Sequence, residues 1–310
     1  MKRYLDRKLK LRHLGVIDAI GTHRSLLKAG KALGVTQPAL TQALRAAESL
    51  MGAALFYRHP KGMTPTALGE RVLETARNIL FELNRLESEL DETLDQGAGT
   101  VVVGALPAAA IGLLPGVIAR MRTAHPNVRI RVLQGRTEEM LAALGVGEVD
   151  LVVGRLYEPE SPDRFQRVAL YREPVVVVAR ADHPLFRKKR VTSALLAQYQ
   201  LALPTATQRV YRDIETFLAG LDIQPTGALR SSSLPLIREM LLSTETVAVM
   251  PKLMMAGDLL RRAVREVRTS APAVIRQGGL ILRADRKLLP PAQAFVEILR
   301  GYVQALKTSA

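Results

Sequence analysis

Two short helices with well-marked ends, predicted for residues 25–51, are the feature that most constrains this chain. Ser25 is placed to cap a first helix that stops at Gly34, and Thr36 is placed to cap a second one whose first turn contains Pro38. The second helix has apolar residues on one face: Leu40, Leu44, Ala47 and Met51. Two helices joined by so short a turn have the spacing of a helix-turn-helix unit.

The outer face of the second helix differs from an ordinary solvated face, which is rich in Glu and Lys. It carries amides, a hydroxyl and one guanidinium, from Gln37, Pro38, Thr41, Gln42 and Arg45. Gln pairs with adenine, Arg with guanine, and Thr can offer its methyl group to thymine. We therefore predict that this face reads bases in the major groove. The alternative left open is a helical hairpin of a core whose polar residues meet water.

Charge supports the nucleic-acid interpretation. Residues 1–66 contain 12 Lys or Arg and 3 Asp or Glu, a net charge of +9, whereas residues 67–95 contain 3 and 8, a net charge of −5. The whole chain carries +15. A basic N-terminal region beside an acidic segment is suited to binding phosphates.

A wing is predicted after the helix pair. An earlier helix around Leu11, Leu14, Ile17 and Ile20 is expected to complete a three-helix core. Leu55 and Phe56 indicate a short strand, and residues 58–62 a turn that carries Arg58 and Lys61. These cations would lie on phosphates or in the minor groove. A solvated hairpin tip is the alternative.

Residues 67–95 are predicted to form one long linker helix, capped by Thr66. Its apolar residues recur at spacings of 3 and 4, with Glu87 interrupting the pattern: Leu73, Ala76, Leu80, Leu83, Leu90 and Leu94. Such a narrow stripe on an acidic helix is not expected to be buried in the core of a monomer, so we predict pairing with a second copy. A homodimer or a homotetramer would result, and residues 96–99 would form a hinge.

Residues 96–310 alternate strands and helices, which predicts a parallel α/β sheet in two lobes. The expected elements of the first lobe are strands 101–103, 128–133 and 151–154 and helices 113–125 and 138–144. The lobe bounds are about 100–164 with 269–310 for lobe I, and about 165–268 for lobe II. The strand 278–283 and a helix from Pro291 would return the chain to lobe I.

Composition and motifs exclude several classes of protein. The chain has no Cys, and its charged first residues lack the apolar core of a signal peptide, so a cytoplasmic protein is expected. Residues 96–119 carry no charge, but five Pro and Gly residues interrupt the apolar part and favour a strand, loop and helix over a membrane span. Neither a phosphate-binding loop, a nucleophile elbow nor a His-Glu-x-x-His motif occurs. We therefore expect no enzyme, cofactor or metal site.

The residues SLLKAGKALGVTQPALTQALRAAESLMGAALFYRHPKGMTPTALG resemble the N-terminal domain of LysR-type transcriptional regulators, and the length and bilobed remainder match that family across nearly the whole chain. DLVVGRL at 150–156 is similar to members that regulate sugar uptake and aromatic-acid breakdown. The resemblance implies a winged helix-turn-helix (1–66), a linker helix (67–95) and a periplasmic-binding-protein-like effector domain (96–310). Gly30 and Ala47 depart from the residues usual there, at a helix cost of about 1 kcal/mol for Gly30. STETVAVMP also lacks the glycines often found before that strand.

The resemblance maps base contacts to Gln37, Pro38, Thr41, Gln42 and Arg45, and wing cations to Arg58 and Lys61. It also implies an effector cleft between the lobes, lined by Pro107, Ala108, Gly135, Thr137, Arg155, Thr205, Thr207 and Ser232. Helix N-termini there would hold a small anion, with Arg155 or Arg209 clamping a carboxylate. For each Thr or Ser, simple helix capping is the alternative.

The predicted function is regulation of transcription by sequence-specific DNA binding, switched by a small, anionic effector. The partners are double-stranded promoter DNA and that effector, with RNA polymerase left open as a further partner and no membrane. The alternative is a solute-binding α/β protein or an enzyme without a regulatory DNA role. Such a protein would not need the basic, capped helix pair.

Overall fold

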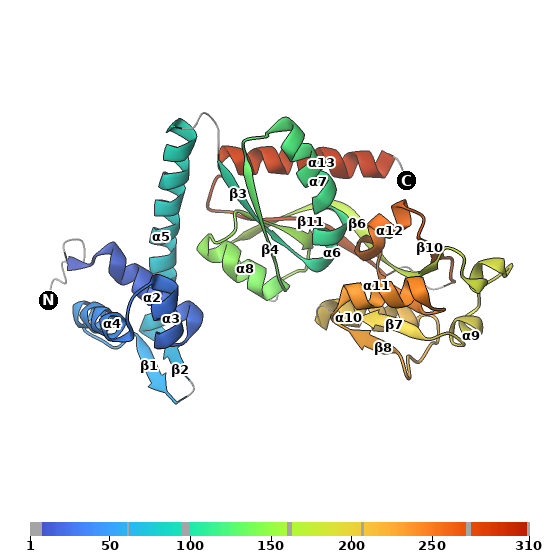
Figure 1. Ribbon diagram of the computed structural model, residues 1–310, viewed down its shortest axis with the longest axis horizontal. Coiled ribbons are helices and arrows are strands. Elements are labelled where there is room, and N and C mark those ends of the chain that lie inside the picture. Colours follow the sequence, from blue (N-terminus) through green and yellow to red (C-terminus); the bar gives the residue numbers. More distant parts are fainter. Residues whose placement is uncertain are drawn as a thin grey trace. The chain divides into compact units, whose positions relative to one another are not determined.

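The computed structural model describes residues 8–60, 62–94, 99–159, 163–205, 208–270 and 274–308. The chain forms two compact units, an N-terminal one and a C-terminal one, and each is described by itself. Figure 1 shows the elements of both units, coloured along the chain.

In the described part of the N-terminal unit, three helices and a β-hairpin precede the linker helix, as the sequence predicts. The elements are α2 (Leu11–His23), α3 (Leu26–Leu33), α4 (Gln37–Met51), β1 (Phe56–His59) and β2 (Gly62–Pro65). Ile17, Ile20 and Leu40 are fully buried where the helices meet, and Leu55 and Phe56 close the core from the hairpin side. Leu11, expected in this core, is instead half exposed at the first residue of α2.

The linker helix α5 (Ala67–Leu94) packs against its own unit at its start. Thr66 Oγ1 accepts a hydrogen bond from Gly69 N at 2.9 Å, which caps the helix. Leu73 and Ala76 are buried in the three-helix core, and Arg77 Nε lies 2.7 Å from Asp18 Oδ1 of α2. The expectation that this apolar stripe cannot be buried within one chain is therefore wrong for its first turns, because α2 covers them.

Lobe I of the C-terminal unit is a sheet with helices on both faces (Figure 1). Its elements are β3 (Thr100–Ala105), α6 (Pro107–Gly112), α7 (Leu114–Ala124), β4 (Arg129–Gln134), α8 (Thr137–Val146), β5 (Leu151–Arg155) and, after lobe II, α13 (Pro290–Thr308). β3 pairs in parallel with both β4 and β5. Apolar residues of α7 and α13 cover one face, around Phe295, while α8 covers the other through Leu144.

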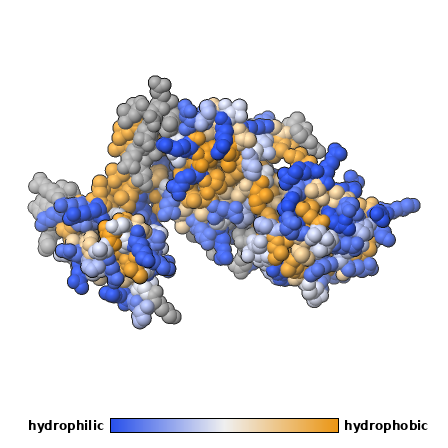
Figure 2. Space-filling model, in the orientation of Figure 1, coloured by the Kyte–Doolittle hydropathy of each residue, from blue (hydrophilic) through white to orange (hydrophobic). Residues whose placement is uncertain are grey.

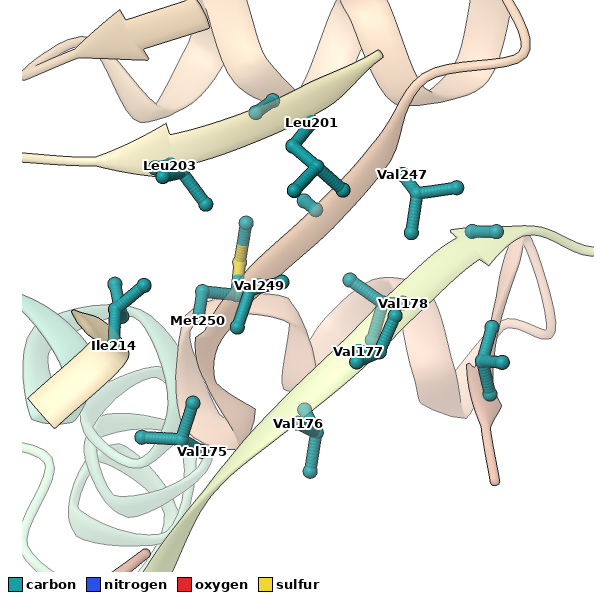
Figure 3. Packing of buried hydrophobic residues seen from close by; sticks show 14 of the residues in the cluster. Val175, Val176, Val177, Val178, Leu201, Leu203, Ile214, Val247, Val249 and Met250 are labelled. Atoms are coloured by element: carbon teal, nitrogen blue, oxygen red, sulfur yellow. The ribbon is translucent and has the colours of Figure 1, made fainter. Parts of the chain in front are cut away.

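Lobe II is built on a second stretch of the same sheet. Its elements are η1 (Pro184–Arg187), α9 (Ser193–Leu196), β7 (Leu201–Pro204), α10 (Gln208–Ala219), β8 (Leu229–Ser231), α11 (Leu234–Ser243), β9 (Val247–Pro251), η2 (Lys252–Met255), α12 (Ala256–Leu260) and β10 (Val264–Val267). Figure 3 shows Val175 to Val178 among other buried residues of the same cluster: Leu201 and Leu203 of β7, Val249 of β9 and Ile214 of α10. These side chains are almost fully excluded from water, so they form the packed core that holds the strands and helices of the lobe together.

One long strand, β6, joins the lobes. β6 (Phe165–Arg180) pairs with β11 (Ile275–Arg283) over residues 165–174, and with β9 and β10 over residues 175–180. The sheet order is β4-β3-β5-β11-β6-β9-β7-β8, with β10 also on β6. β6 thus belongs to both lobes, whereas the sequence prediction starts lobe II at residue 165.

The uncharged stretch of residues 96–119 contains β3, α6 and the start of α7 in the part that the structure describes. Gly112 permits the close approach of α6 to η2, because a Cβ there would lie 2.5 Å from the Leu253 carbonyl oxygen. None of the helices within the described ranges combines the length and the hydropathy that a membrane-spanning segment requires.

Candidate DNA-binding surface and effector cleft

The exposed helix of the N-terminal unit, α4, begins after the predicted cap, Thr36. Thr36 Oγ1 accepts a hydrogen bond from Ala39 N at 3.4 Å, and Ser25 Oγ accepts one from Lys28 N at 3.4 Å in the preceding helix. Gly34 ends α3 with φ of 66°, a left-handed conformation that glycine adopts without strain. The turn between α3 and α4 is therefore fixed by local sequence.

The structure brings the five predicted base-contacting residues together on α4. Gln37, Pro38, Thr41, Gln42 and Arg45 line one shallow surface. Within the described chain, no carboxylate pairs with the Arg45 guanidinium. The Thr41 hydroxyl donates to Gln37 O at 2.9 Å, so its proton is used inside the helix and its methyl group is left for an outside partner. The surface offers donors, acceptors and one cation without an anion beside them.

The wing is held against the end of α2 by its second strand. β1 and β2 are antiparallel, with Phe56 opposite Pro65 and His59 opposite Gly62. Met63 N donates to Arg24 O at 2.8 Å. Gly62 has φ of 133° and no room for a Cβ, which would lie within 2.4 Å of Arg24 O. Arg58 is exposed on β1, whereas Lys61 lies outside the described residues.

A cleft of about 430 Å³ lies between the two lobes of the C-terminal unit. Lobe I contributes α6, the end of β4 and the start of α8, while lobe II contributes the end of β7, the N-terminus of α11 and η2. Of the predicted effector residues, Pro107, Gly135 and Ser232 line this cleft. Both lobes therefore present strand ends and helix starts to the same space.

Three other predicted effector residues are described by the structure but are not among those that line the cleft. Ala108 is buried in the core below α6, and Thr137 is buried at the first residue of α8. Thr205 is half-buried, and its backbone N donates to Ser231 O at 2.9 Å. Thr207 lies outside the described residues.

Arg155 lies in a buried ionic network that links the lobes. Its guanidinium Nε lies 2.5 Å from Glu173 Oε2, and Nη1 lies 2.6 Å from Asp213 Oδ2. Arg276 binds the other oxygen of Asp213 through Nη2 at 2.6 Å and Nε at 2.9 Å. Burial raises the pKa of Glu173, and the Arg155 charge opposes that rise. With two cations and two carboxylates, the network balances its charge.

The other predicted clamp, Arg209, also has partners within the chain. Its guanidinium lies 4.5 Å from the centre of the Tyr157 ring, and Nη2 lies 3.6 Å from Glu138 Oε1 on α8. Because Arg209 belongs to α10, this pair crosses from lobe II to lobe I. Neither Arg155 nor Arg209 is among the residues that line the cleft.

Comparison with known proteins identifies both units. Residues 11–70 match the bacterial regulatory helix-turn-helix proteins of the lysR family, and residues 94–304 match the LysR substrate binding domain. The chain belongs to the LysR family. This LysR-type regulator is 28% identical to the uncharacterized HTH-type transcriptional regulator YdcI of Escherichia coli K12, over 95% of this chain and 96% of that protein. It is 27% identical to the HTH-type transcriptional regulator PcaQ of Agrobacterium fabrum, over 96% of each.

A solved structure of the LysR family regulator CbnR in complex with its target DNA has the same fold. The TM-score is 0.65 at 20% identity, over 95% of this chain and 100% of CbnR. The predicted family and fold class are thus confirmed, and so is the prediction of a transcriptional regulator rather than an enzyme, since the LysR-type relatives are regulators.

The structure of this LysR-type regulator also reveals residues that sequence reasoning missed. Arg136 lines the cleft between two predicted positions, Gly135 and Thr137, and no carboxylate pairs with its guanidinium in the described part of the chain. Ser233, next to the predicted Ser232, caps α11 by accepting from Leu236 N at 3.3 Å. In the sequence, the polar runs QGRTEE and RSSSLP, which contain Arg136 and Ser233, could have indicated both residues.

In the DNA-binding unit of this LysR-type regulator, sequence reasoning missed the role of Glu48. Its Oε1 accepts hydrogen bonds from Leu55 N at 2.8 Å and Phe56 N at 3.4 Å. The carboxylate therefore ties the C-terminal part of α4 to the start of the wing. Gly30, expected to weaken α3, instead lies close to the next turn, because a Cβ there would come within 2.9 Å of Val35 O.

Proposed function

We propose that α4 reads the operator and that the wing holds the DNA backbone. Gln37, Gln42 and Arg45 offer hydrogen bonds to base edges, Pro38 and the Thr41 methyl group offer apolar contact, and Arg58 and Lys61 bind phosphates. The observation that carries this assignment is the single exposed face on a capped helix, with no carboxylate paired to its one guanidinium. A helix face that only meets solvent does not require amides and an unpaired guanidinium gathered on one side.

A mobility-shift titration on the chain's own upstream DNA and on a scrambled duplex, at two salt concentrations, tests the assignment. Arg45→Ala should cost about 1–3 kcal/mol on the operator and much less on the scrambled duplex. Arg58→Ala should weaken binding to both duplexes alike and reduce the salt dependence. Equal losses on both duplexes for Arg45→Ala would contradict base reading.

We further propose that the cleft binds a small anionic effector, held by Arg136 and the N-terminus of α11. The first backbone N–H groups of that helix, beside Ser232 and Ser233, provide positive potential at the lobe II side. Glu139 also lines the cleft, but its Oε2 already accepts from Arg136 N at 2.9 Å. Arg136 therefore takes the clamp role that the sequence assigned to Arg155 or Arg209.

Arg131 provides a matched control, because it is exposed on β4, the strand that ends two residues before Arg136, and does not line the cleft. A panel of aromatic carboxylates and sugars, measured by thermal shift on the full chain, should contain a compound that raises the midpoint. Arg136→Ala should abolish that rise, and Arg131→Ala should retain it. The clamp assignment fails if the two variants respond alike.

The regulator acts, in this proposal, as a homodimer or homotetramer in the cytosol. Leu86 and Leu90 of α5 are 50% and 51% exposed, so they are available to a second copy of the helix. Effector binding must favour one arrangement of the paired DNA-binding units energetically, and the bound assembly then contacts RNA polymerase. Light scattering with and without DNA measures the oligomeric state.

A further inference from the structure

A second hollow, separate from the inter-lobe cleft, lies at one end of lobe II. It encloses about 520 Å³ between residues 185–191, which include the end of η1, and residues 265–270, which begin on β10. Figure 1 places α9 and β10 at this end of the lobe, and Figure 2 shows hydrophilic side chains projecting there. The hollow shares no lining residue with the inter-lobe cleft.

The rim of this hollow is strongly cationic. Five exposed cations line it: Lys188, Lys189, Arg190, Arg265 and Arg268. The described chain provides no carboxylate ion pair for any of the five. The single lining carboxylate, Glu266, lies 2.9 Å from Lys252 Nζ, which is outside the hollow. The positive potential of the rim is therefore not neutralised by the protein.

The floor of the hollow is apolar and rigid. Leu185 and Val267 are buried in the lobe II core, and the half-buried Phe186 and Val191, which pack against that core, are the apolar side chains that a ligand can reach. Val267 pairs with Val177 in the β10–β6 ladder. His183, itself fully buried, accepts from Leu185 N through Nδ1 at 3.1 Å and donates to Glu245 O through Nε2 at 3.2 Å. Both walls are thus held in place before any ligand binds.

One rim cation is also positioned by an aromatic ring. The Arg265 guanidinium lies 4.1 Å from the centre of the Phe186 ring, a cation–π contact that joins β10 to η1 across the hollow. Holding Arg265 in this way reduces the conformational entropy that it loses when an anion binds. A basic surface that only keeps the protein soluble does not require such an arrangement.

We propose that this hollow binds a small organic molecule that carries two or more phosphate groups. Several unpaired cations converge on a confined space, which favours a ligand with several charges close together, and phosphate groups accept from both Lys and Arg. The apolar floor favours an organic part beside the phosphates. A concave site fits a small ligand better than the convex backbone of duplex DNA. The regulator would then sense a phosphorylated metabolite apart from its cleft effector.

Isothermal titration calorimetry on the full chain tests the proposal with three probes: ADP, inorganic pyrophosphate and citrate. ADP and pyrophosphate should bind, ADP more tightly because its organic part covers the floor, and citrate should bind more weakly than both. Lys189→Gln with Arg265→Gln should weaken ADP binding by about tenfold or more, since charge-assisted hydrogen bonds are lost. All of these side chains are exposed, so the variant is expected to fold.

The matched control is Arg122→Gln with Arg131→Gln, which removes two exposed cations from lobe I and should leave ADP affinity unchanged. Arg136→Ala, in the cleft, should also leave it unchanged, so this test is independent of the cleft proposal. Three results would overturn the inference: no binding of ADP or pyrophosphate, equal losses in the hollow and control variants, or citrate binding as tightly as ADP. The inference would also be overturned if Lys189→Gln with Arg265→Gln bound random duplex DNA more weakly but bound ADP as tightly as the wild type, because the cations would then serve DNA binding.

Discussion

Replacing Asp213 by Asn should destabilise the C-terminal unit more than any exposed ion pair would. Asp213 is buried and accepts three hydrogen bonds from two guanidiniums, at 2.6, 2.6 and 2.9 Å. Asn keeps the shape of the side chain but removes the charge, and it turns an amide N–H₂ toward one guanidinium. Two cations then share the site with only one carboxylate, that of Glu173.

The size of this effect follows from the exposure of the two partners. Breaking a buried ion pair by removing one partner costs about 3–5 kcal/mol. Arg155 is only 3% exposed and depends fully on the network, whereas Arg276 is 48% exposed and can regain water. The lower end of the range is therefore expected, about 3 kcal/mol, which corresponds to a fall in the midpoint of unfolding of about 6–12 °C for a unit of this size.

Glu215→Gln is the control, because Glu215 lies on the same helix and pairs with Arg230 at 3.1 Å with both side chains about one-third exposed. Such a pair contributes about 0–1 kcal/mol. Differential scanning calorimetry of the full chain, with circular dichroism to follow secondary structure, measures both variants. If Asp213→Asn lowers the midpoint no further than Glu215→Gln, the network does not stabilise the fold and our reasoning is refuted.

Three further predictions concern the wing, the linker helix and acid stability. Glu48→Ala should lower the stability of the N-terminal unit by about 1–2 kcal/mol, since it leaves two backbone N–H groups of the wing without an acceptor. Glu48→Gln keeps an acceptor oxygen and should retain most of the wild-type stability. Equal losses of stability for the two variants in thermal unfolding would contradict this role. Leu86→Asp with Leu90→Asp should yield smaller oligomers by light scattering, and an intact assembly would exclude this helix face. Arg238 lowers the pKa of Asp258 below its ordinary 3.8, so this pair stabilises the fold above about pH 4 and the contribution is lost as pH falls through the lowered pKa. The difference in unfolding midpoint between the wild type and Asp258→Asn should therefore shrink in acid, and a constant difference would argue against the pair.

Local features of the DNA-binding unit could be predicted from the sequence because short-range physics determines them. The caps Ser25 and Thr36, the stop at Gly34 and the two faces of α4 all depend on residues within one or two turns of each other. The wing hairpin follows the predicted order, although β1 extends to His59. Its attachment through Glu48 was missed, since a half-buried Glu on a helix has many alternative partners.

The position of the effector cleft could be predicted from the sequence, but not all of the residues that line it. Strand ends and helix starts are visible in the sequence, which explains why Pro107, Gly135 and Ser232 fall on the cleft. The neighbouring sequence does not show which arginine lacks an ion-pair partner and is available to an effector. Arg155 finds Asp213 58 positions away, and Arg276 reaches the same carboxylate from 63 positions away, so only the folded chain shows that this arginine is occupied.

The continuity of β6 limits how the regulator can respond to a ligand. β6 pairs with β11 up to Pro174 and with β9 from Val175 onward, so this connection keeps its ladder hydrogen bonds where the chain passes from one lobe to the other. Any relative rotation must therefore bend or twist paired backbone. We therefore expect a ligand to rotate the lobes only slightly, because a larger rotation would break ladder hydrogen bonds of β6.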